Sequence, residues 1–197
     1  GGITDCENYG EMKIKAVQSD PFKYGWTTSK GYSNWSTYLE KTTNANGFFS
    51  VGGIATFAQS NMDIGVDFRG LNNWANIDVE VDTEYALGEK GAIYYADNLG
   101  ICVGGVMGLM GANAKNPRYT ECSNMANVRL KSNKTASEAF VGGVIGKTAS
   151  NRNVKDADFY SVTGCANIGK VEFVTDSPET TIAHVGGVIG AAIAGKI

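Results

Sequence analysis

Apolar and polar residues alternate along four short segments of the chain. Residues 12–16 alternate Met, Ile and Ala with two lysines, and residues 77–82 alternate Ile and two valines with three carboxylates. Shorter alternations occupy residues 128–131 and 171–174. Successive side chains of a strand point to opposite faces, so a period of two predicts β-strands with one buried face and one solvent-exposed face.

A glycine-rich phrase occurs four times and divides the chain into repeats. Its copies begin at Val51, Val103, Val141 and Val185, which are 52, 38 and 44 residues apart. Recurrence at such intervals indicates a repeat architecture. Because glycine has no Cβ, each pair predicts a place where the backbone turns sharply or where neighbouring layers approach closely. The paired glycines are Gly52, Gly53, Gly104, Gly105, Gly142, Gly143, Gly186 and Gly187.

A five-residue companion segment precedes each glycine phrase, at residues 6–10, 71–75, 122–126 and 165–169. Its third residue is asparagine in all four copies, and its fifth is glycine or alanine. Asparagine at a turn can bond the backbone two residues further on, and stacked asparagines can bond along the stack. We therefore predict one strand near the companion, a second strand at the glycine phrase, and a structural role for the asparagines. These are Asn8, Asn73, Asn124 and Asn167.

Aligning the four repeats brings opposite charges to the same outward positions. If the copies lie in register about 4.8 Å apart, these charges attract along the stack. The alternation therefore favours parallel, in-register stacking. One column reads Lys13, Asp78, Arg129 and Glu172, and the next reads Lys15, Glu80, Lys131 and Val174.

The repeats predict an all-β fold, a parallel β-helix or β-solenoid of about four irregular repeats with loop insertions. A two-sheet β-sandwich with antiparallel repeats is the alternative. We expect residues 1–197 to form a single β-solenoid domain that is a segment of a longer chain. The reason is that no polar cap is visible after the fourth glycine phrase, so this end would pack on further repeats of the same chain or on another molecule.

The two recurring segments together resemble the GLUG-type repeats of bacterial surface and secreted proteins. The likeness rests on Val-Gly-Gly-Val-Ile-Gly at residues 141–146 and 185–190 and on Cys-x-Asn-x-Gly at residues 6–10 and 165–169. It covers nearly the whole chain and implies an extracellular or cell-surface, adhesin-like β-solenoid without catalytic residues or cofactors. The first glycine phrase lacks the closing glycine and the second companion lacks the cysteine, so we expect those repeats to be less regular.

The insertion at roughly residues 21–49 is rich in aromatic residues among Ser, Thr, Asn and Gly. Flat rings with polar tips suit stacking on sugars or docking of proteins, and long loops on a rigid scaffold often carry binding. The alternative is a local core that pins the insertion to the solenoid or caps its end. The first interpretation predicts a site for a glycan or a surface protein at Tyr24, Trp26, Tyr32, Trp35 and Tyr38.

Charge and hydropathy exclude several classes of partner. The net charge is −3 and no run of five basic residues occurs, which argues against a nucleic-acid surface. The longest apolar stretch, residues 182–195, is shorter than the roughly 20 residues of a membrane-spanning helix. The four cysteines form no C-x-x-C pair, and there is one histidine, so we expect no metal site.

Three of the cysteines, Cys6, Cys122 and Cys165, share the first companion position, which predicts an inward-facing column of small apolar side chains. Neighbouring repeats could bring Cys122 close to Cys165, but parallel Cβ directions disfavour a disulfide. The single histidine, His184, aligns with Ser, Cys and Phe in the other repeats, a variation that indicates packing or surface rather than catalysis.

Carboxylates on one strand face are candidates for glycoside chemistry, because parallel β-helices often carry lyases and glycosidases. The candidates are Asp78, Glu80 and Asp82, but the alternating charge columns explain them without catalysis. We therefore predict an adhesin-like or structural module that is not an enzyme. The alternative is a carbohydrate-active enzyme, a lyase or glycosidase, on a β-helix scaffold.

Overall fold

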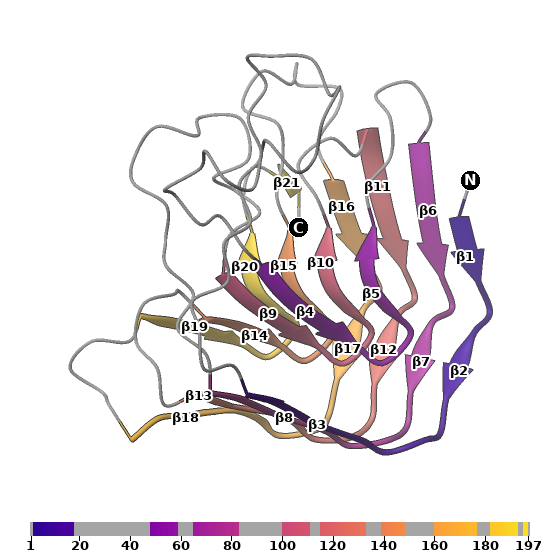
Figure 1. Cartoon of the computed structure of the whole chain (residues 1–197). Helices are drawn as coiled ribbons and strands as arrows, with labels where there is room; N and C mark the ends of the chain where they lie inside the picture. Colours follow the sequence, from indigo (N-terminus) through magenta and orange to yellow (C-terminus); the bar gives the residue numbers. More distant parts are fainter. Residues whose placement is uncertain are drawn as a thin grey trace, which may run out of the picture.

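The computed structural model describes residues 2–17, 48–58, 65–82, 100–110, 115–132, 139–148, 160–176, 182–192 and 195–196. Within these ranges the ordered elements are all β, and the strands stack as successive coils of a parallel β-helix (Figure 1). The predicted fold class is confirmed, and the antiparallel sandwich is wrong because every strand pairing is parallel. No helix long and apolar enough to cross a membrane occurs in this part of the chain.

Each coil of the described chain contains five strands. The first coil contains β1 (Gly2–Thr4), β2 (Glu7–Asn8), β3 (Met12–Val17), β4 (Phe48–Gly52) and β5 (Ala55–Ala58). The second contains β6 (Gly65–Arg69), β7 (Asn72–Asn73), β8 (Ile77–Asp82), β9 (Gly100–Gly104) and β10 (Met107–Met110).

The third coil contains β11 (Lys115–Thr120), β12 (Ser123–Asn124), β13 (Val128–Ser132), β14 (Ala139–Gly142) and β15 (Ile145–Thr148). The fourth contains β16 (Tyr160–Thr163), β17 (Ala166–Asn167), β18 (Val171–Val174), β19 (Ala183–Gly186) and β20 (Ile189–Ala192). A last strand, β21 (Gly195–Lys196), pairs with β16 and begins a fifth coil.

Corresponding strands of successive coils form five parallel sheets. Sheet 1 has the order β1-β6-β11-β16-β21, sheet 2 β2-β7-β12-β17, sheet 3 β3-β8-β13-β18, sheet 4 β4-β9-β14-β19 and sheet 5 β5-β10-β15-β20. The two strands predicted for each repeat are present, in sheets 3 and 4, but each coil contains three further strands that the sequence analysis did not predict. The strands of sheet 2 are two residues long, and those of sheet 5 do not alternate apolar with polar residues, so neither sheet leaves a periodic signal.

Two apolar cores lie inside the coils. One joins sheets 3 and 4, where Val79, Val103 and Leu130 are fully buried. The other joins sheets 1, 2 and 5 and includes Phe68 and Tyr119, whose rings stack with centroids 5.0 Å apart. Burying a side chain of this size contributes about 1.5–3 kcal/mol, so these columns supply the main stabilisation of the stack.

The turn between sheets 1 and 2 has the same backbone conformation in every coil. The residue at this turn has φ of 52° at Asp5, 61° at Gly70, 55° at Glu121 and 63° at Gly164. A left-handed conformation favours glycine, yet two coils place a carboxylate side chain there. The turn is therefore imposed by the stacking, since each of the first three residues donates its N–H to a carbonyl of the next coil.

The expectation that the first two repeats would be less regular is wrong for the described strands. β5 pairs with β10 in register although the first phrase lacks its closing glycine, and β7 pairs with both neighbours in register. The register shift lies instead between β6 and β11, from Lys115 to Arg118. Pro117 lies within that step, and proline cannot donate a ladder hydrogen bond.

Candidate functional site

The predicted ligand-binding residues Tyr24, Trp26, Tyr32, Trp35 and Tyr38 lie outside the described residues. That site therefore stays a prediction. The described part of the chain offers three other features: a buried spine, a charged face and an exposed apolar ridge.

The buried spine consists of a ladder of asparagine side chains, which runs through all four coils, and of the glycines that pack against this ladder. The Nδ2 of Asn8 donates to the Oδ1 of Asn73 at 2.7 Å, Asn73 donates to Asn124 at 2.6 Å, and Asn124 donates to Asn167 at 2.7 Å. The Nδ2 groups of the last three also donate to the carbonyl two residues further on, at 2.6–2.8 Å. Both predicted roles of asparagine, bonding its own turn and bonding along the stack, are confirmed.

The second glycine of each phrase packs against this ladder. A Cβ added to Gly53 would lie 2.8 Å from the Oδ1 of Asn73, and one added to Gly105 would lie 2.6 Å from the Oδ1 of Asn124. Gly143 is in the same relation to Asn167, at 2.6 Å. No larger residue fits so close to another layer, so the predicted close approach at the glycine pairs is confirmed for the first three coils.

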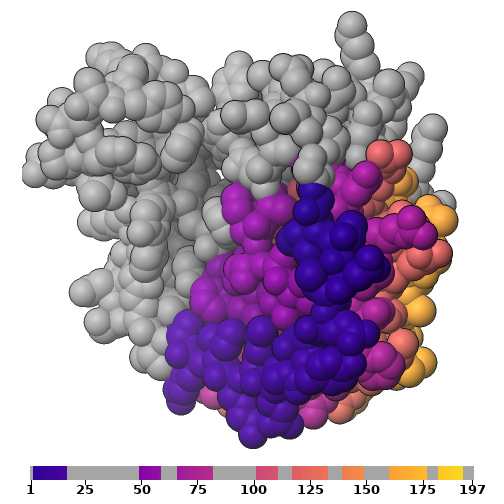
Figure 2. Space-filling model, turned by 90° about the vertical axis from the view of Figure 1, so that its right-hand side faces the viewer, coloured from indigo at the N-terminus to yellow at the C-terminus, as the bar shows by residue number. Residues whose placement is uncertain are grey.

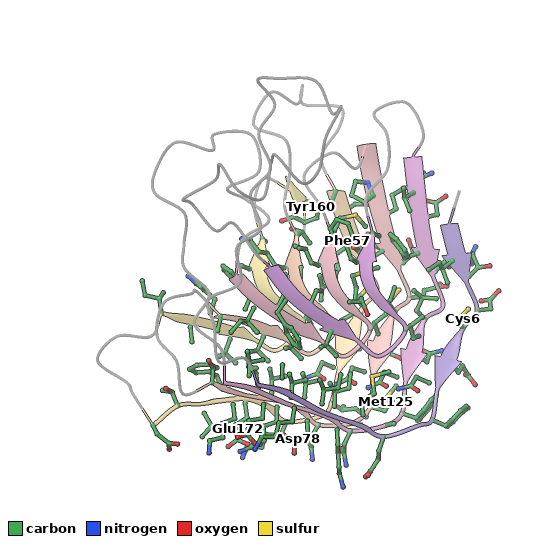
Figure 3. All side chains as sticks on the ribbon, in the orientation of Figure 1. Cys6, Phe57, Asp78, Met125, Tyr160 and Glu172 are labelled. Carbon is green, nitrogen blue, oxygen red and sulfur yellow. The ribbon has the colours of Figure 1, made fainter. Side chains whose placement is uncertain are left out.

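The charged face is the outer side of sheet 3, from which Asp78 and Glu172 both project (Figure 3). Asp78 accepts a 2.7 Å hydrogen bond from Arg129 of the next coil, and Glu80 lies 3.6 Å from the Nζ of Lys15 of the coil before. Two of the predicted contacts along the stack are therefore present. Both carboxylates already contact basic side chains, and the side chain of Asp82 lies outside the described residues.

Lys13 and Glu172, the first and last residues of one charge column, form ion pairs that differ from the prediction. Lys13 is in register with Asp78, but its Nζ lies 3.5 Å from Glu11 of its own coil. Glu172 is in register with Arg129, but it accepts from Lys170 at 2.9 Å. Exposed ion pairs are worth about 0–1 kcal/mol, so a partner in the same coil competes on equal terms with one across the stack.

The fourth companion residue forms an exposed apolar column, which we call the corner ridge. It consists of Tyr9, Trp74, Met125 and Ile168, one residue from each coil. Tyr9 is 69% exposed, Trp74 46% and Ile168 76%, whereas Met125 is half-buried. The rings of Tyr9 and Trp74 are nearly parallel, at 5°, with centroids 6.2 Å apart.

The corner ridge follows from the asparagine ladder beside it. Backbone bonds from Trp74 to Asn8, and from Met125 to Asn73, hold each ridge residue one coil above the preceding asparagine. Because the asparagine points inward, the next residue points outward, and Met125 lies at the corner between β12 and β13 (Figure 3). Sequence analysis missed this ridge, although all four residues at this position are apolar or aromatic.

The hydroxyl of Tyr9 donates to the carboxylate of Glu7 at 2.5 Å. This hydrogen bond is the main reason that the pKa of Tyr9 is raised above its ordinary value. The bond also holds the ring at the first coil in one orientation while its face stays exposed. Among the described side chains, Tyr9 and Trp74 therefore form the strongest candidate for a stacking surface.

His184 stacks on Phe140, with ring centroids 5.0 Å apart and planes at 7°. The Nζ of Lys147 lies 4.1 Å from the centroid of the same phenylalanine ring. Cys102 occupies the equivalent position one coil before Phe140, so it lies two coils, about 9.6 Å, from His184. Burial raises the pKa of the Cys102 thiol to about 12. The two side chains therefore do not form a cysteine–histidine catalytic pair, and the predicted packing role of His184 agrees with its position.

The predicted inward cysteine column is confirmed. Cys122 is buried in the core of sheets 1, 2 and 5, Cys6 and Cys165 pack against it, and all four cysteines of the chain are free thiols. Contact with Cys165, together with burial, raises the pKa of the Cys122 thiol. No group of three or more His, Cys, Asp or Glu side chains able to hold a metal ion occurs among the residues that the structure describes.

Comparison of the chain with protein-family models, with curated proteins and with solved structures gave no match. The resemblance to GLUG-type repeats therefore remains a prediction from the sequence.

Proposed function

We propose that this chain is an adhesin-like structural module of a secreted or surface-displayed bacterial protein, which presents binding surfaces on a rigid β-solenoid. The observation that carries the proposal is the corner ridge, an exposed apolar column held by a buried spine. Large exposed apolar patches mark sites of interaction. The resemblance to GLUG-type repeats supports the extracellular location.

The ligand class follows from the chemistry of the ridge and of the insertion. Tyr9 and Trp74 offer exposed aromatic rings with polar tips, which suit the apolar face of a sugar or a protein side chain. The insertion that contains Trp26 and Trp35 offers a second set of the same kind. A glycan or a surface protein is therefore the proposed partner, and the proposal includes no cofactor.

The proposal assigns no catalytic residue. A glycosidase requires two carboxyl groups that converge on one bond, one acting as an acid and the other as a base or nucleophile. Asp78 and Glu80 lie on one strand, and each contacts a basic side chain from a neighbouring coil. This arrangement favours a stabilising role for both residues over the enzyme alternative.

The test is binding of the purified chain to arrays of glycans and of surface proteins, followed by titration of each hit. Trp74→Ala should weaken binding at the ridge at least about tenfold, because buried aromatic residues dominate such contacts. The double variant Trp26→Ala/Trp35→Ala tests the insertion, and Arg69→Ala, an exposed side chain of sheet 1, is the matched control. Binding that all these variants leave unchanged would exclude both surfaces, and no binding to any glycan or protein would overturn the proposal.

A further inference from the structure

Two thiols of the inward cysteine column lie in neighbouring coils. Cys122 follows β11 in the third coil, and Cys165 follows β16 in the fourth. The residue after each cysteine is paired in register with its counterpart, and so is the residue two positions before it. The two cysteines therefore lie one above the other, and both pack in the core of sheets 1, 2 and 5.

The two thiols make equivalent contacts, which shows that they point in the same direction. Each Sγ lies near the carbonyl two residues back in its own coil and near a carbonyl of the preceding coil. These distances are 3.6 and 3.5 Å for Cys122 and 3.7 Å in both cases for Cys165. The carbonyls belong to Thr120, Phe68, Thr163 and Tyr119. Parallel side chains at equivalent positions are separated by the spacing between coils, so the two sulfurs are held about 4.8 Å apart.

This separation is too long for a disulfide but suits another kind of link. An S–S bond is about 2.05 Å long and joins Cβ atoms about 3.8 Å apart, so a disulfide would require movement of the coils or of both side chains. Metal–thiolate bonds are about 2.3 Å long, so a linear sulfur–metal–sulfur unit spans about 4.6 Å. An ion between the two sulfurs therefore fits the stack as it stands.

The number of ligands decides which ion fits. Structural zinc takes four ligands in a tetrahedron, and the described ranges contain no group of three or more His, Cys, Asp or Glu side chains able to hold a metal. A soft monovalent ion such as Cu(I) prefers thiolates, and two of them on opposite sides suffice for it. The prediction of no metal site considered zinc-type ligand sets, and two stacked thiols fall outside it.

The surroundings favour the thiolate form that a metal ligand requires. Interaction with the Cys122 thiol lowers the pKa of Cys165 to about 7, and backbone groups at Cys122 and Thr163 act in the same direction. One thiol, one thiolate and one Cu(I) give a bis-thiolate complex with one negative charge, and the remaining thiol proton is released. No oxidant or reductant takes part in this step.

A buried hydroxyl in the same core is an independent observation. Tyr119 is 0% exposed, and its hydroxyl has no hydrogen-bond partner among the described residues. Burial is the main reason that the pKa of Tyr119 is raised, and negative charge on Cys122 and Cys165 raises it further, so the ring lies within electrostatic range of both thiols. Unsatisfied buried groups in native proteins point to a water or an ion that completes the site. The hydroxyl keeps its proton and is a donor for the negative charge of a bis-thiolate complex.

We propose that Cys122 and Cys165 form a two-coordinate site for a soft monovalent metal ion, Cu(I), which links the third and fourth coils. Both ligands and both coils belong to the described chain, so the site is complete whatever packs on either side of the stack. An ion that binds the folded chain and bridges two coils stabilises the fold according to its affinity and concentration. The proposal does not depend on the proposed binding function.

Cys6 provides a matched comparison within the same column. It belongs to the first coil, indigo in Figure 2, and the third and fourth coils lie behind that coil. Its Sγ lies 3.4 Å from the carbonyl of Thr4, two residues back, as in the pair. The second coil has Leu71 at this position, so the nearest thiol of the column is two coils from Cys6, about 9.6 Å away. Cys6 therefore shares the placement of the pair but lacks a second sulfur for a bridging ion.

The main test is competition for Cu(I) between the chain and a chromophoric Cu(I) chelator, without oxygen and with a thiol-free reductant. We expect one Cu(I) per chain. Cys165→Ala removes one of two ligands and should weaken binding at least about 100-fold, since even second-shell partners of metal ligands contribute about 10–100-fold. Cys6→Ala is the matched control and should bind within about twofold of the unaltered chain.

Urea denaturation gives a second measurement on the same three chains. Cu(I) should raise the urea midpoint of the unaltered chain and of Cys6→Ala, because the ion binds the folded state. It should leave the midpoint of Cys165→Ala unchanged. Circular dichroism without the ion verifies that each variant is folded.

X-ray absorption at the copper edge tests the geometry on the unaltered chain, so this result does not depend on how well a variant folds. We expect two sulfur ligands and no other ligand at bonding distance. Four outcomes would overturn the proposal: no Cu(I) binding by the unaltered chain, equal losses in Cys6→Ala and Cys165→Ala, three or more ligands on the ion, or a disulfide between Cys122 and Cys165 after treatment with glutathione disulfide. The last would show that the two sulfurs are not held apart.

Discussion

The buried spine and the charged face both consist of columns of equivalent residues that lie in register along the stack. Only in the spine does every residue bond the next member of its own column. Every pair of neighbouring asparagines is bonded along the stack, at 2.6–2.7 Å. On the charged face, Asp78 and Glu80 pair across coils, but Lys13 and Glu172 pair with residues of their own coils.

Burial explains this difference. A buried amide without a partner costs about 1–3 kcal/mol, so the ladder has one satisfactory arrangement. An exposed charge has water and several neighbours as alternatives, and each pair is worth about 0–1 kcal/mol. The spine and the apolar cores therefore set the register between neighbouring coils. The surface charges pair with whichever partners that register brings close.

The largest effect should come from adding a methyl group to the spine. Gly105→Ala would bring a Cβ to 2.6 Å from Asn124 and against the carbonyl of Gly143, so the coils must separate. We expect a loss of about 3 kcal/mol in the free energy of unfolding, as for an overpacked core. Urea denaturation followed by circular dichroism measures this change.

Gly187→Ala is the matched control, because nothing lies within 4 Å of the added Cβ. Its cost should stay within about 0.5 kcal/mol, the range of ordinary surface changes. Equal effects of the two substitutions would show that close approach between coils is not the reason for the glycine pairs.

A second effect, of intermediate size, concerns pH and the buried thiol of Cys102. Its pKa is raised by burial to about 12, from an ordinary value of 9.0. As pH rises, the unfolded chain therefore loses the thiol proton before the folded chain does. The contribution of Cys102 to the free energy of unfolding is complete below pH 9 and is lost as pH rises toward 12. Through this group, the free energy of unfolding falls by at most about 1.4 kcal/mol per pH unit.

Cys102→Ala should reduce that slope, since alanine does not titrate. The measurement is the urea midpoint between pH 8 and pH 11 for both chains. Identical slopes would mean that the thiol is not held in its neutral form by burial.

The smallest effect should come from the charged face. Arg129→Ala removes the 2.7 Å contact with Asp78 and should lower the free energy of unfolding by about 0.5 kcal/mol, with a smaller loss at 1 M salt. Thermal unfolding at low and high salt measures it. A loss comparable with that of Gly105→Ala would contradict the view that the spine, rather than the charges, sets the register.

Much of the architecture could be predicted from columns of equivalent residues. The asparagines, the glycine pairs and the inward cysteines all recur once per coil, and recurrence in one chain is sufficient to align coils that must stack. The sequence analysis did not predict the strands of sheets 1, 2 and 5. The strands of sheet 2 have two residues and those of sheet 5 do not alternate, so neither carries a period, whereas the alternation Val66-Asp67-Phe68-Arg69 in β6 was overlooked. The candidate site illustrates the same limit: the apolar character of Tyr9, Trp74, Met125 and Ile168 is visible in the sequence, but the exposure of Tyr9, Trp74 and Ile168 is not.

The sequence by itself determined which residues lie above one another, because repeat spacing and residue type leave one alignment in which asparagine meets asparagine. Only the tertiary structure decided which way the asparagine and corner-ridge columns face and which partner each charge takes. The physical reason is that stacking is a local, repeated constraint, whereas burial depends on how all five sheets close around the cores. Trp74, apolar yet 46% exposed, and Asn73, polar yet 0% exposed, are adjacent residues that show this division.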